Sequence, residues 1–380
     1  MISKSYLDAF IPEGKSSDVC VNCGICLQKC PVMKMEKDES RAEMRRRLNG
    51  EETKRILKEC TFCFSCNHYC PQGLRPYNLI MERMIEKNRQ AGAAVPPFIS
   101  YMMTGKSESG YFYDLYKAGS DEDKAILDRW TQKPSKAKDT LFSGCYGRTI
   151  PQSLEYSKTL AGLPKFGPRD ACCGEIPHRF GDYEYFSANV ERTRKMLESL
   201  NTERLVCYCG SCANYLGNIW PNYHGVQLPY PVISLYEWLW EQYSAGELAI
   251  QRPFSKDIAI SDSCYTSELG EGYYKAFRGL HEAAGMRTVE LANNRYDSLC
   301  CGFACSIRNG YDQTQVAIAA KKKLDQIVET KQTAVSVNCP GCWVGISNAA
   351  KVGNQDIKVR FAINDILRAF GDEAPASKGK

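Results

Sequence analysis

The 380-residue sequence predicts an all-α domain followed by two copies of an α/β domain. The first part repeats a cysteine motif, C-x2-C-x2-C-x3-C-P, on either side of a segment rich in Glu, Lys, Arg, Met and Leu, which favour helix. The second part repeats a longer pattern in which short apolar runs alternate with helical stretches, as in parallel α/β folds. Eighteen of the 20 cysteines belong to these two patterns, so the same residues define the domains and the chemistry.

The N-terminal cysteine runs have the spacing of iron-sulfur ligands. Each run resembles a site of a two-cluster ferredoxin, in which three closely spaced thiolates bind one [4Fe-4S] cubane and the fourth binds the other. We therefore expect one cubane on Cys20, Cys23, Cys26 and Cys70, and a second on Cys60, Cys63, Cys66 and Cys30. Pro31 and Pro71 agree with this geometry, because proline disfavours helix at the preceding residue and so ends each loop at its last ligand.

Disulfide bonds and zinc are the two other interpretations of these cysteines. The chain begins MISKSYLDAF, without the charged and apolar regions of a secretory signal, so an oxidising compartment is not expected. Zinc accepts C-x2-C pairs, but it does not explain a third cysteine in register, twice, followed by C-P. Cubane clusters explain the whole pattern.

Composition excludes several classes of protein. Hydrophobic residues make up 43% of the chain and charged residues 24%, which provides material for packed cores and excludes a disordered chain. No run of about 18 apolar residues occurs, so a membrane-spanning helix is not expected. The formal charge of +5 is modest and basic residues have acidic neighbours, so nucleic-acid binding is not expected. We expect a cytoplasmic protein that reaches a membrane surface only through a partner.

Domain limits follow from the spacing of these motifs. The 29 residues between Cys30 and Cys60 predict two helices with a break near residue 50, longer than the hairpin of a compact bacterial ferredoxin. The predicted parts are a helical ferredoxin domain with two [4Fe-4S] clusters over 1–92, a connector over 93–138, α/β repeats over 139–250 and 251–371, and a flexible tail over 372–380.

Each α/β repeat contains five cysteines in the order C…CCG…C-x2-C. Between the first cysteine and the CCG motif lie 26 residues in the first repeat and 35 in the second. Adjacent cysteines are awkward ligands for one iron, but Gly174 and Gly302 give the backbone freedom to turn. A cluster with irons spread apart and bridged by one cysteine sulfur would use all five. Because predicted strands end at these cysteines, we expect them at the carboxyl ends of a parallel sheet, where ligands gather.

At these residues the sequence resembles the CCG-domain superfamily, in particular heterodisulfide reductase catalytic subunits with a fused ferredoxin domain. In that family a five-cysteine CCG domain holds a noncubane [4Fe-4S] cluster where a disulfide is reduced. The resemblance covers about 330 of the 380 residues and implies one or two noncubane clusters. Their ligands would be Cys145, Cys172, Cys173, Cys209 and Cys212 in the first repeat, and Cys264, Cys300, Cys301, Cys339 and Cys342 in the second.

The first repeat departs from the family pattern. Its shorter spacing removes a segment before Cys172, where LPKFGPRDACCGE has Gly and Pro rather than a strand. This departure either opens a channel for a substrate or shortens a loop. A CCG fold that keeps its cysteines without a noncubane cluster is therefore the alternative.

The resemblance implies an oxidoreductase subunit. Electrons would come from a flavoprotein or another iron-sulfur subunit, pass through the cubanes to the noncubane clusters, and reduce the disulfide of a small molecule. The same architecture occurs in iron-sulfur subunits of anaerobic glycerol-3-phosphate dehydrogenase, glycolate oxidase and lactate-utilisation systems. The alternative function is an electron relay between a flavin dehydrogenase and a membrane quinone or haem partner. Four clusters with exposed edges also point to an anaerobic organism.

Three more residues are candidates for a role at the clusters. His178, five residues past Cys173, is a candidate catalytic residue that would give a proton to a reduced thiolate, and a hydrogen bond to the backbone is the alternative. Cys207 lies two residues before Cys209 on a predicted strand, and Cys305 lies four residues after Cys301 on a predicted helix. Both either line cluster pockets or are buried inert thiols.

Overall fold

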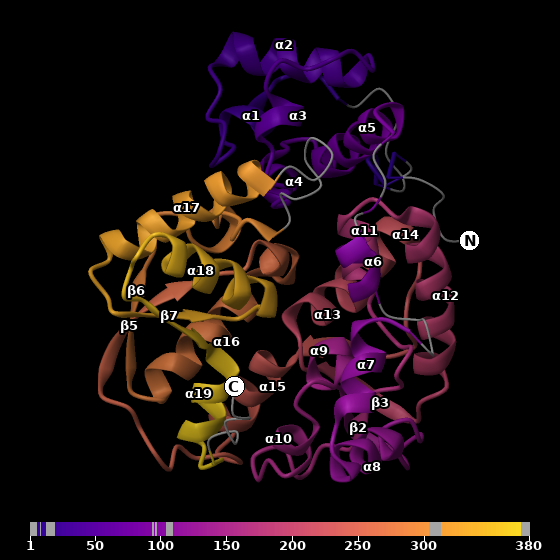
Figure 1. Ribbon diagram of the computed structural model, residues 1–380, viewed down its shortest axis with the longest axis vertical. Coiled ribbons are helices and arrows are strands. Elements are labelled where there is room, and N and C mark those ends of the chain that lie inside the picture. The colour runs from indigo at the N-terminus through magenta and orange to yellow at the C-terminus, as the bar shows by residue number, and fades with distance from the viewer. Residues whose placement is uncertain are drawn as a thin grey trace.

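The computed structural model describes residues 6–7, 9–12, 20–92, 95, 97–103, 109–303 and 313–373 (Figure 1). Helices fill the N-terminal part, at the top of Figure 1, and two α/β units lie below it side by side. Within the described residues, no helix is both long and apolar enough to cross a bilayer.

The described N-terminal residues contain helices and no strand, as predicted. The helices are α1 (Ile25–Gln28), α2 (Lys37–Leu48), α3 (Ile56–Glu59), α4 (Ser65–Tyr69) and α5 (Pro76–Gln90). Helix α2 ends at the expected break, because Gly50 adopts a φ of 74° that a continuing helix does not allow. Pro76 occupies the first turn of α5, where its missing N–H costs no hydrogen bond.

Three connector helices follow and pack on the first α/β unit. They are α6 (Pro97–Met102), α7 (Tyr111–Ala118) and α8 (Asp121–Arg129). Ser120 caps α8 in a capping box with Asp123. Trp130, at the end of α8, donates a hydrogen bond to Glu155 of the first unit at 2.9 Å.

The first α/β unit contains a parallel sheet with the strand order β2-β1-β3-β4. Its strands are β1 (Ala137–Phe142), β2 (Lys165–Phe166), β3 (Thr202–Cys207) and β4 (Val232–Ser234). Its helices are α9 (Gly144–Gly147), α10 (Pro151–Glu155), α11 (Glu175–Arg179), α12 (Tyr183–Glu198), α13 (Gly210–Asn214), a π-helical segment η2 (Tyr215–Ile219), α14 (Trp220–His224) and α15 (Leu235–Ser244).

The second unit repeats this topology, with the parallel strand order β6-β5-β7-β8. Its strands are β5 (Lys256–Ser261), β6 (Met286–Glu290), β7 (Ala334–Val337) and β8 (Lys358–Phe361). Its helices are the 3-10 helices η3 (Cys264–Leu269) and η4 (Arg295–Asp297), and α16 (Gly270–Ala283), α17 (Gln313–Glu329), α18 (Pro340–Val352) and α19 (Ala362–Ala369). The predicted fold class, a helical domain followed by two repeated α/β domains, is confirmed.

The expectation that LPKFGP contains no strand is wrong. Lys165 and Phe166 form β2 and pair in parallel with the end of β1. Pro164 and Gly167 limit the strand to two residues, because proline cannot donate to the ladder and glycine weakens a strand. Most of the nine missing residues still lie directly before Cys172, as expected: β2 is three residues shorter than β6, and four fewer residues separate it from the CCG motif. The stretch between the first two strands is only two residues shorter in the first unit, 143–164 against 262–285.

The two units pack through α15 and α16, which lie between them in Figure 1. Tyr236 of α15 makes edge contacts with Tyr273 and Phe277 of α16, with ring centres 5.9 and 5.1 Å apart. At the other end of this interface Asp372 is buried and accepts hydrogen bonds from Ser157 and Thr159. Asp372, the first residue of the predicted tail over 372–380, therefore belongs to this interface, and residues 374–380 lie outside the described part.

Candidate iron-sulfur sites

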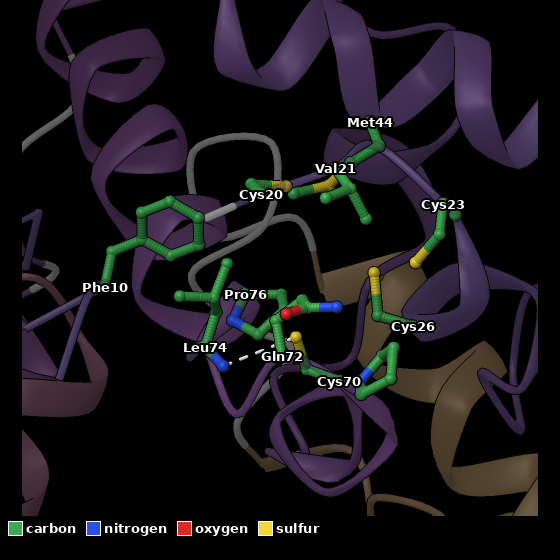
Figure 2. Close-up of a pocket in the computed structure, with 12 residues that line it drawn as sticks. Phe10, Cys20, Val21, Cys23, Cys26, Met44, Cys70, Gln72, Leu74 and Pro76 are labelled. Carbon is green, nitrogen blue, oxygen red and sulfur yellow. Dashed lines mark hydrogen bonds between the residues drawn. The ribbon is translucent and has the colours of Figure 1, made fainter. Parts of the chain in front are cut away.

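The first N-terminal cavity has four cysteines in its wall (Figure 2). Its empty space is about 340 Å³, which includes solvent at its mouth. Its thiols are those of Cys20, Cys23, Cys26 and Cys70, three from the first run and one from the second, which is the predicted exchange of the fourth ligand. The backbone N–H of Leu74 points at the sulfur of Cys70 from 3.3 Å. Burial, aided by the neighbouring thiols, raises the pKa of Cys26 to about 12, so a thiolate here needs a bound cation.

A second cavity of about 350 Å³ lies beside the first. Its wall contains Cys30, Cys60, Cys63 and Cys66, together with Cys26, which lines both cavities. Backbone N–H groups of Met33 and Phe62 point at sulfurs of this set, from 3.5 and 3.4 Å. Both predicted cubane sets are therefore gathered around separate but adjoining spaces.

The two cysteine loops have the same unusual backbone shape. Asn22 and Gly24 have φ values of 50° and 76°, and the equivalent Phe62 and Phe64 have 53° and 65°. A left-handed phenylalanine is strained, and such strain concentrates at functional sites. Among the described residues, no three His, Cys, Asp or Glu side chains are arranged to hold one metal ion, whereas the cysteines here surround open cavities. A cavity between four sulfurs suits a multi-iron cluster better than one zinc ion.

The five cysteines of the first repeat form one continuous chain of thiol contacts. Neighbouring thiols lie close enough to shift one another's pKa, in the order Cys145, Cys172, Cys173, Cys212 and Cys209. Cys145 follows strand β1 and Cys209 follows β3, so the thiols lie at the carboxyl ends of the strands, as expected.

The second repeat has the same chain in the same order. Here the neighbouring thiols that shift one another's pKa follow the order Cys264, Cys300, Cys301, Cys342 and Cys339. After each CCG pair the glycine is left-handed, with φ of 84° at Gly174 and 96° at Gly302. Each of these glycines also directs its N–H at the first sulfur of the pair, from 3.4 and 3.3 Å. In both repeats the predicted sharp turn therefore directs a backbone N–H at the first cysteine of the CCG pair.

The two thiol chains approach each other at Cys209 and Cys339. Burial, together with the nearby thiols of Cys209 and Cys339, raises the pKa of Tyr146 to about 12. The pKa of Tyr236 is raised by burial and by the same two thiols. Cys209, Cys339 and Cys145 are half-buried, whereas the other seven thiols of the two chains are buried. These three cysteines are therefore the most exposed of the ten.

A large cavity lies between the repeats, with about 1550 Å³ of empty space that includes solvent at its mouth. Its wall on one side is α10 and its flanking residues, from Thr149 to Lys158, and on the other side Asn364 and Leu367 of α19. Tyr208, next to Cys209 in the chain, also lines it, and its buried hydroxyl has no hydrogen-bond partner among the described residues.

Buried arginines beside the cysteines were not predicted from the sequence. The guanidinium groups of Arg47, Arg148 and Arg179 are buried, and each has at least one N–H group with no partner in the described part of the chain. Arg47 lies near Cys60, and Arg148 lies near three thiols of the first repeat. An unpaired buried guanidinium N–H is costly, so these groups fit sites that hold an anionic, acceptor-rich group such as an iron-sulfur cluster. Their only sequence signal is a basic residue close to a cysteine motif.

His178 lies in an aromatic cluster. Its Nδ1 is 2.9 Å from the Tyr215 hydroxyl, and its ring contacts those of Tyr6, Phe186 and His224. Burial lowers the pKa of His178 well below the usual value, so the ring is neutral at neutral pH. The next residue, Arg179, is the one that contacts a cysteine sulfur.

Cys207 lies at the end of β3, fully buried between the register partners Phe142 and Ser234. It lies outside the chain of thiol contacts in the first repeat. The prediction for Cys305 lies outside the described residues.

The N-terminal part contacts the second repeat through aromatic side chains. Phe64, in the wall of the second cavity, stacks on Tyr77 with ring centres 3.7 Å apart. The hydroxyl of Tyr77 is 3.3 Å from that of Tyr265, the residue after Cys264. The thiols of Cys60 and Cys264 both add to the rise that burial causes in the pKa of Tyr77, so this ring lies between the two sets.

Comparisons with known proteins agree with this division of the chain. Residues 16–74 match the family "4Fe-4S dicluster domain", and residues 140–217 and 258–347 match the family "Cysteine-rich domain", also called CCG. The chain is 23% identical over 400 residues to a subunit of the dihydromethanophenazine:CoB--CoM heterodisulfide reductase of Methanosarcina barkeri, covering 93% of this chain and 94% of that protein.

Two other relatives differ in name. The chain is 24% identical over 381 residues to a subunit of the fumarate reductase (CoM/CoB) of Methanothermobacter marburgensis, covering 93% of this chain and 72% of that one. It is 22% identical over 344 residues to "Probable membrane-anchored ferredoxin" of Chromohalobacter salexigens, covering 84% of this chain and 49% of that one. The chain therefore combines a 4Fe-4S dicluster domain with two CCG domains, and it is an iron-sulfur oxidoreductase subunit related to the matching subunit of heterodisulfide reductase.

Proposed function

We propose that this protein is the disulfide-reducing subunit of a multi-subunit reductase. The observation that carries the proposal is the pair of five-thiol chains, which have the same order in both repeats and approach each other at Cys209 and Cys339. Two [4Fe-4S] cubanes would occupy the N-terminal cysteine sets, and a noncubane [4Fe-4S] cluster would occupy each five-cysteine set. When bound, these clusters would supply one-electron redox chemistry.

The proposed reaction consumes two electrons and two protons. In R–S–S–R′ + 2e⁻ + 2H⁺ → RSH + R′SH the S–S bond breaks, and each sulfur gains one electron and one proton. The half-buried ends Cys145, Cys209 and Cys339 mark the side on which a small-molecule disulfide reaches the sites. The electrons come from a donor protein, a flavoprotein or another iron-sulfur subunit. Both reductase relatives are named as subunits, which supports such a partner.

His178 is a weaker catalytic candidate than the sequence indicated. A neutral ring that is hydrogen-bonded to Tyr215 is a poor proton donor at neutral pH. Tyr215 does stack parallel to Tyr265, with ring centres 6.0 Å apart, and Tyr265 follows Cys264. A proton role for His178 would therefore act through Tyr215, and His178→Gln tests it as a loss of turnover with normal iron content.

The second candidate function is an electron relay without a substrate of its own. It is favoured by the relative named as a membrane-anchored ferredoxin. In this case the partners would be a flavin dehydrogenase and a membrane-bound quinone or haem protein. The residues that hold the clusters would be the same, and the half-buried cysteines would face a protein instead of a disulfide.

Iron and sulfide analysis of anaerobically purified protein, with low-temperature EPR, tests the proposed clusters. About sixteen irons per chain support four clusters, whereas about eight support the cubanes alone. The iron-loaded protein is then reduced with dithionite and mixed with low-molecular-weight disulfides, and thiol release is measured after the excess reductant is removed. Sixteen irons without thiol release from any disulfide would favour the relay.

A further inference from the structure

Arg179 connects the two five-cysteine sites. It ends helix α11, six residues after Cys173, so it belongs to the CCG loop of the first repeat. Its Nη2 nevertheless lies 3.6 Å from the sulfur of Cys264, the first cysteine of the second repeat. The second site therefore includes a side chain that the first repeat supplies.

Three contacts hold this guanidinium in place. Arg179 is 6% exposed, and its Nη1 pairs with Oε1 of Glu175 at 2.6 Å, one turn earlier on α11. Its central carbon lies 3.1 Å from the centre of the Tyr265 ring. The positive charge is thus fixed and shielded from water. Charge interactions are stronger in such a buried position than at the surface.

Tyr265 brings the same charge close to the N-terminal part. Its hydroxyl contacts Tyr77, and Tyr77 stacks on Phe64 in the wall of the second cubane cavity. Arg179 also acts on the ionisation of Tyr77. The first site, the second site and the N-terminal part therefore meet at this one side chain.

We propose that Arg179 is a positioning residue that couples the two five-cysteine sites, by holding Cys264 in place and by stabilising an added electron in the second site. The inference rests on the proposed function, because it needs a cluster in that site. An electron adds one negative charge without breaking a bond, so a fixed positive charge nearby favours the reduced form. The carboxylate of Glu175 partly cancels this effect, so the two residues act on the second site with opposite sign.

An EPR-monitored redox titration of the iron-loaded, full-length protein tests this coupling, with dithionite as the electron source. Arg179→Gln removes the charge, and we expect the midpoint potential of the second site to fall by about 59 mV, which is a tenfold shift for a one-electron couple. Glu175→Gln leaves the arginine uncompensated, so the midpoint rises. Arg179→Lys keeps the charge and stays close to the wild type. The signal of the second site is identified by its loss in Cys301→Ser.

A matched control is Arg194→Gln. Arg194 lies on α12 of the same repeat, at the surface, where it pairs with Glu191 and Glu198. Its loss removes one positive charge without moving the midpoint. If Arg179→Gln loses iron, the rise of the midpoint potential in Glu175→Gln and its unchanged value in Arg179→Lys still test the effect of this charge.

The outcomes separate this inference from the function on which it rests. Wild-type protein with only about eight irons overturns the proposed clusters and, with them, this inference. Sixteen irons, together with midpoints that stay unchanged or move in the same direction in Arg179→Gln and Glu175→Gln, overturn the inference alone. A purely structural role would not produce shifts of opposite sign.

Discussion

The two α/β repeats share one strand order and one order of thiol contacts, yet several of their elements differ in length, most of all the helix after the first strand. In the second repeat the 14-residue α16 packs against α15 of the first. The equivalent pair, α10 and α19, encloses the large cavity between the repeats, because α10 has only five residues. The comparison teaches that a duplicated fold becomes asymmetric when one packing helix is short in one copy, while the order of the five cysteines stays the same in both.

The surroundings of the thiols differ as well. The first chain of thiols is half-buried at both ends, Cys145 and Cys209, whereas the second is half-buried only at Cys339. The first chain has Arg148 of its own repeat nearby, and the second has Arg179 of the other repeat. The first site is thus the more open one. Both repeats contact the N-terminal part, the first where Tyr6 packs on His178 and the second where Tyr77 meets Tyr265.

The largest expected effect is the loss of a cluster from one repeat alone. Cys173→Ser or Cys301→Ser removes the middle sulfur of one thiol chain, so each variant should lose about four of sixteen irons. Iron analysis and EPR measure the loss. Cys207→Ser is the control, since this thiol is buried outside the chain of contacts and should lose no iron. Loss of about eight irons in either variant would mean that the two sites do not assemble separately.

The next largest effect is expected from replacing the glycine after the CCG pair of the first repeat. A Cβ at Gly174 would lie 2.7 Å from the Phe186 ring, in a left-handed backbone with φ of 84°. We expect Gly174→Ala to lower the free energy of unfolding by about 2 kcal/mol or more, since the backbone term alone is about 1–2 kcal/mol. Anaerobic urea unfolding followed by circular dichroism measures it. Gly162→Ala, with open space around its Cβ, is the control, and equal costs for both variants would contradict the prediction.

Filling the cavity between α10 and α19 tests whether the shortened helix serves the substrate. Ser153 lies in the cavity wall, so Ser153→Trp should raise KM for a cleaved disulfide about fivefold or more, with unchanged iron content, if the disulfide enters there. Steady-state thiol release measures KM. Ser187→Trp on α12, away from the cavity wall, serves as the control. An unchanged KM in Ser153→Trp would mean that the disulfide enters elsewhere.

The smallest effect concerns the helix that follows the last strand of each repeat. Ser234 caps α15 in a capping box with Glu237, whereas Phe361 precedes α19 without a side-chain cap. Ser234→Ala should therefore cost about 1 kcal/mol of unfolding free energy, measured by anaerobic urea unfolding. Ser199→Ala, at the exposed end of α12, is the comparison and should cost less. A cost near zero for Ser234→Ala would show that α15 is held by its packing alone.

Much of the architecture could be predicted from local patterns. Cysteine spacing predicted the exchange of Cys30 and Cys70 between cavities that the structure forms, and repeated apolar runs predicted the strands that end at the thiols. Strand β2 was missed because Pro and Gly flank it and only two residues pair. The catalytic role of His178 stays a prediction, because closeness to Cys173 in the sequence does not set which way the side chain points from a short helix, and the ring lies against Tyr215.

The sequence by itself determined which cysteines act together, because ligand spacing and strand periodicity are local properties of the chain. Only the tertiary structure decided that Arg179 of one repeat reaches Cys264 of the other, and that Tyr77 meets Tyr265. Such contacts join residues 85 and 188 positions apart. The first contact depends on how the packed helices α15 and α16 orient the two repeats, and the second on how the N-terminal helices pack on the second repeat. No single segment encodes either arrangement.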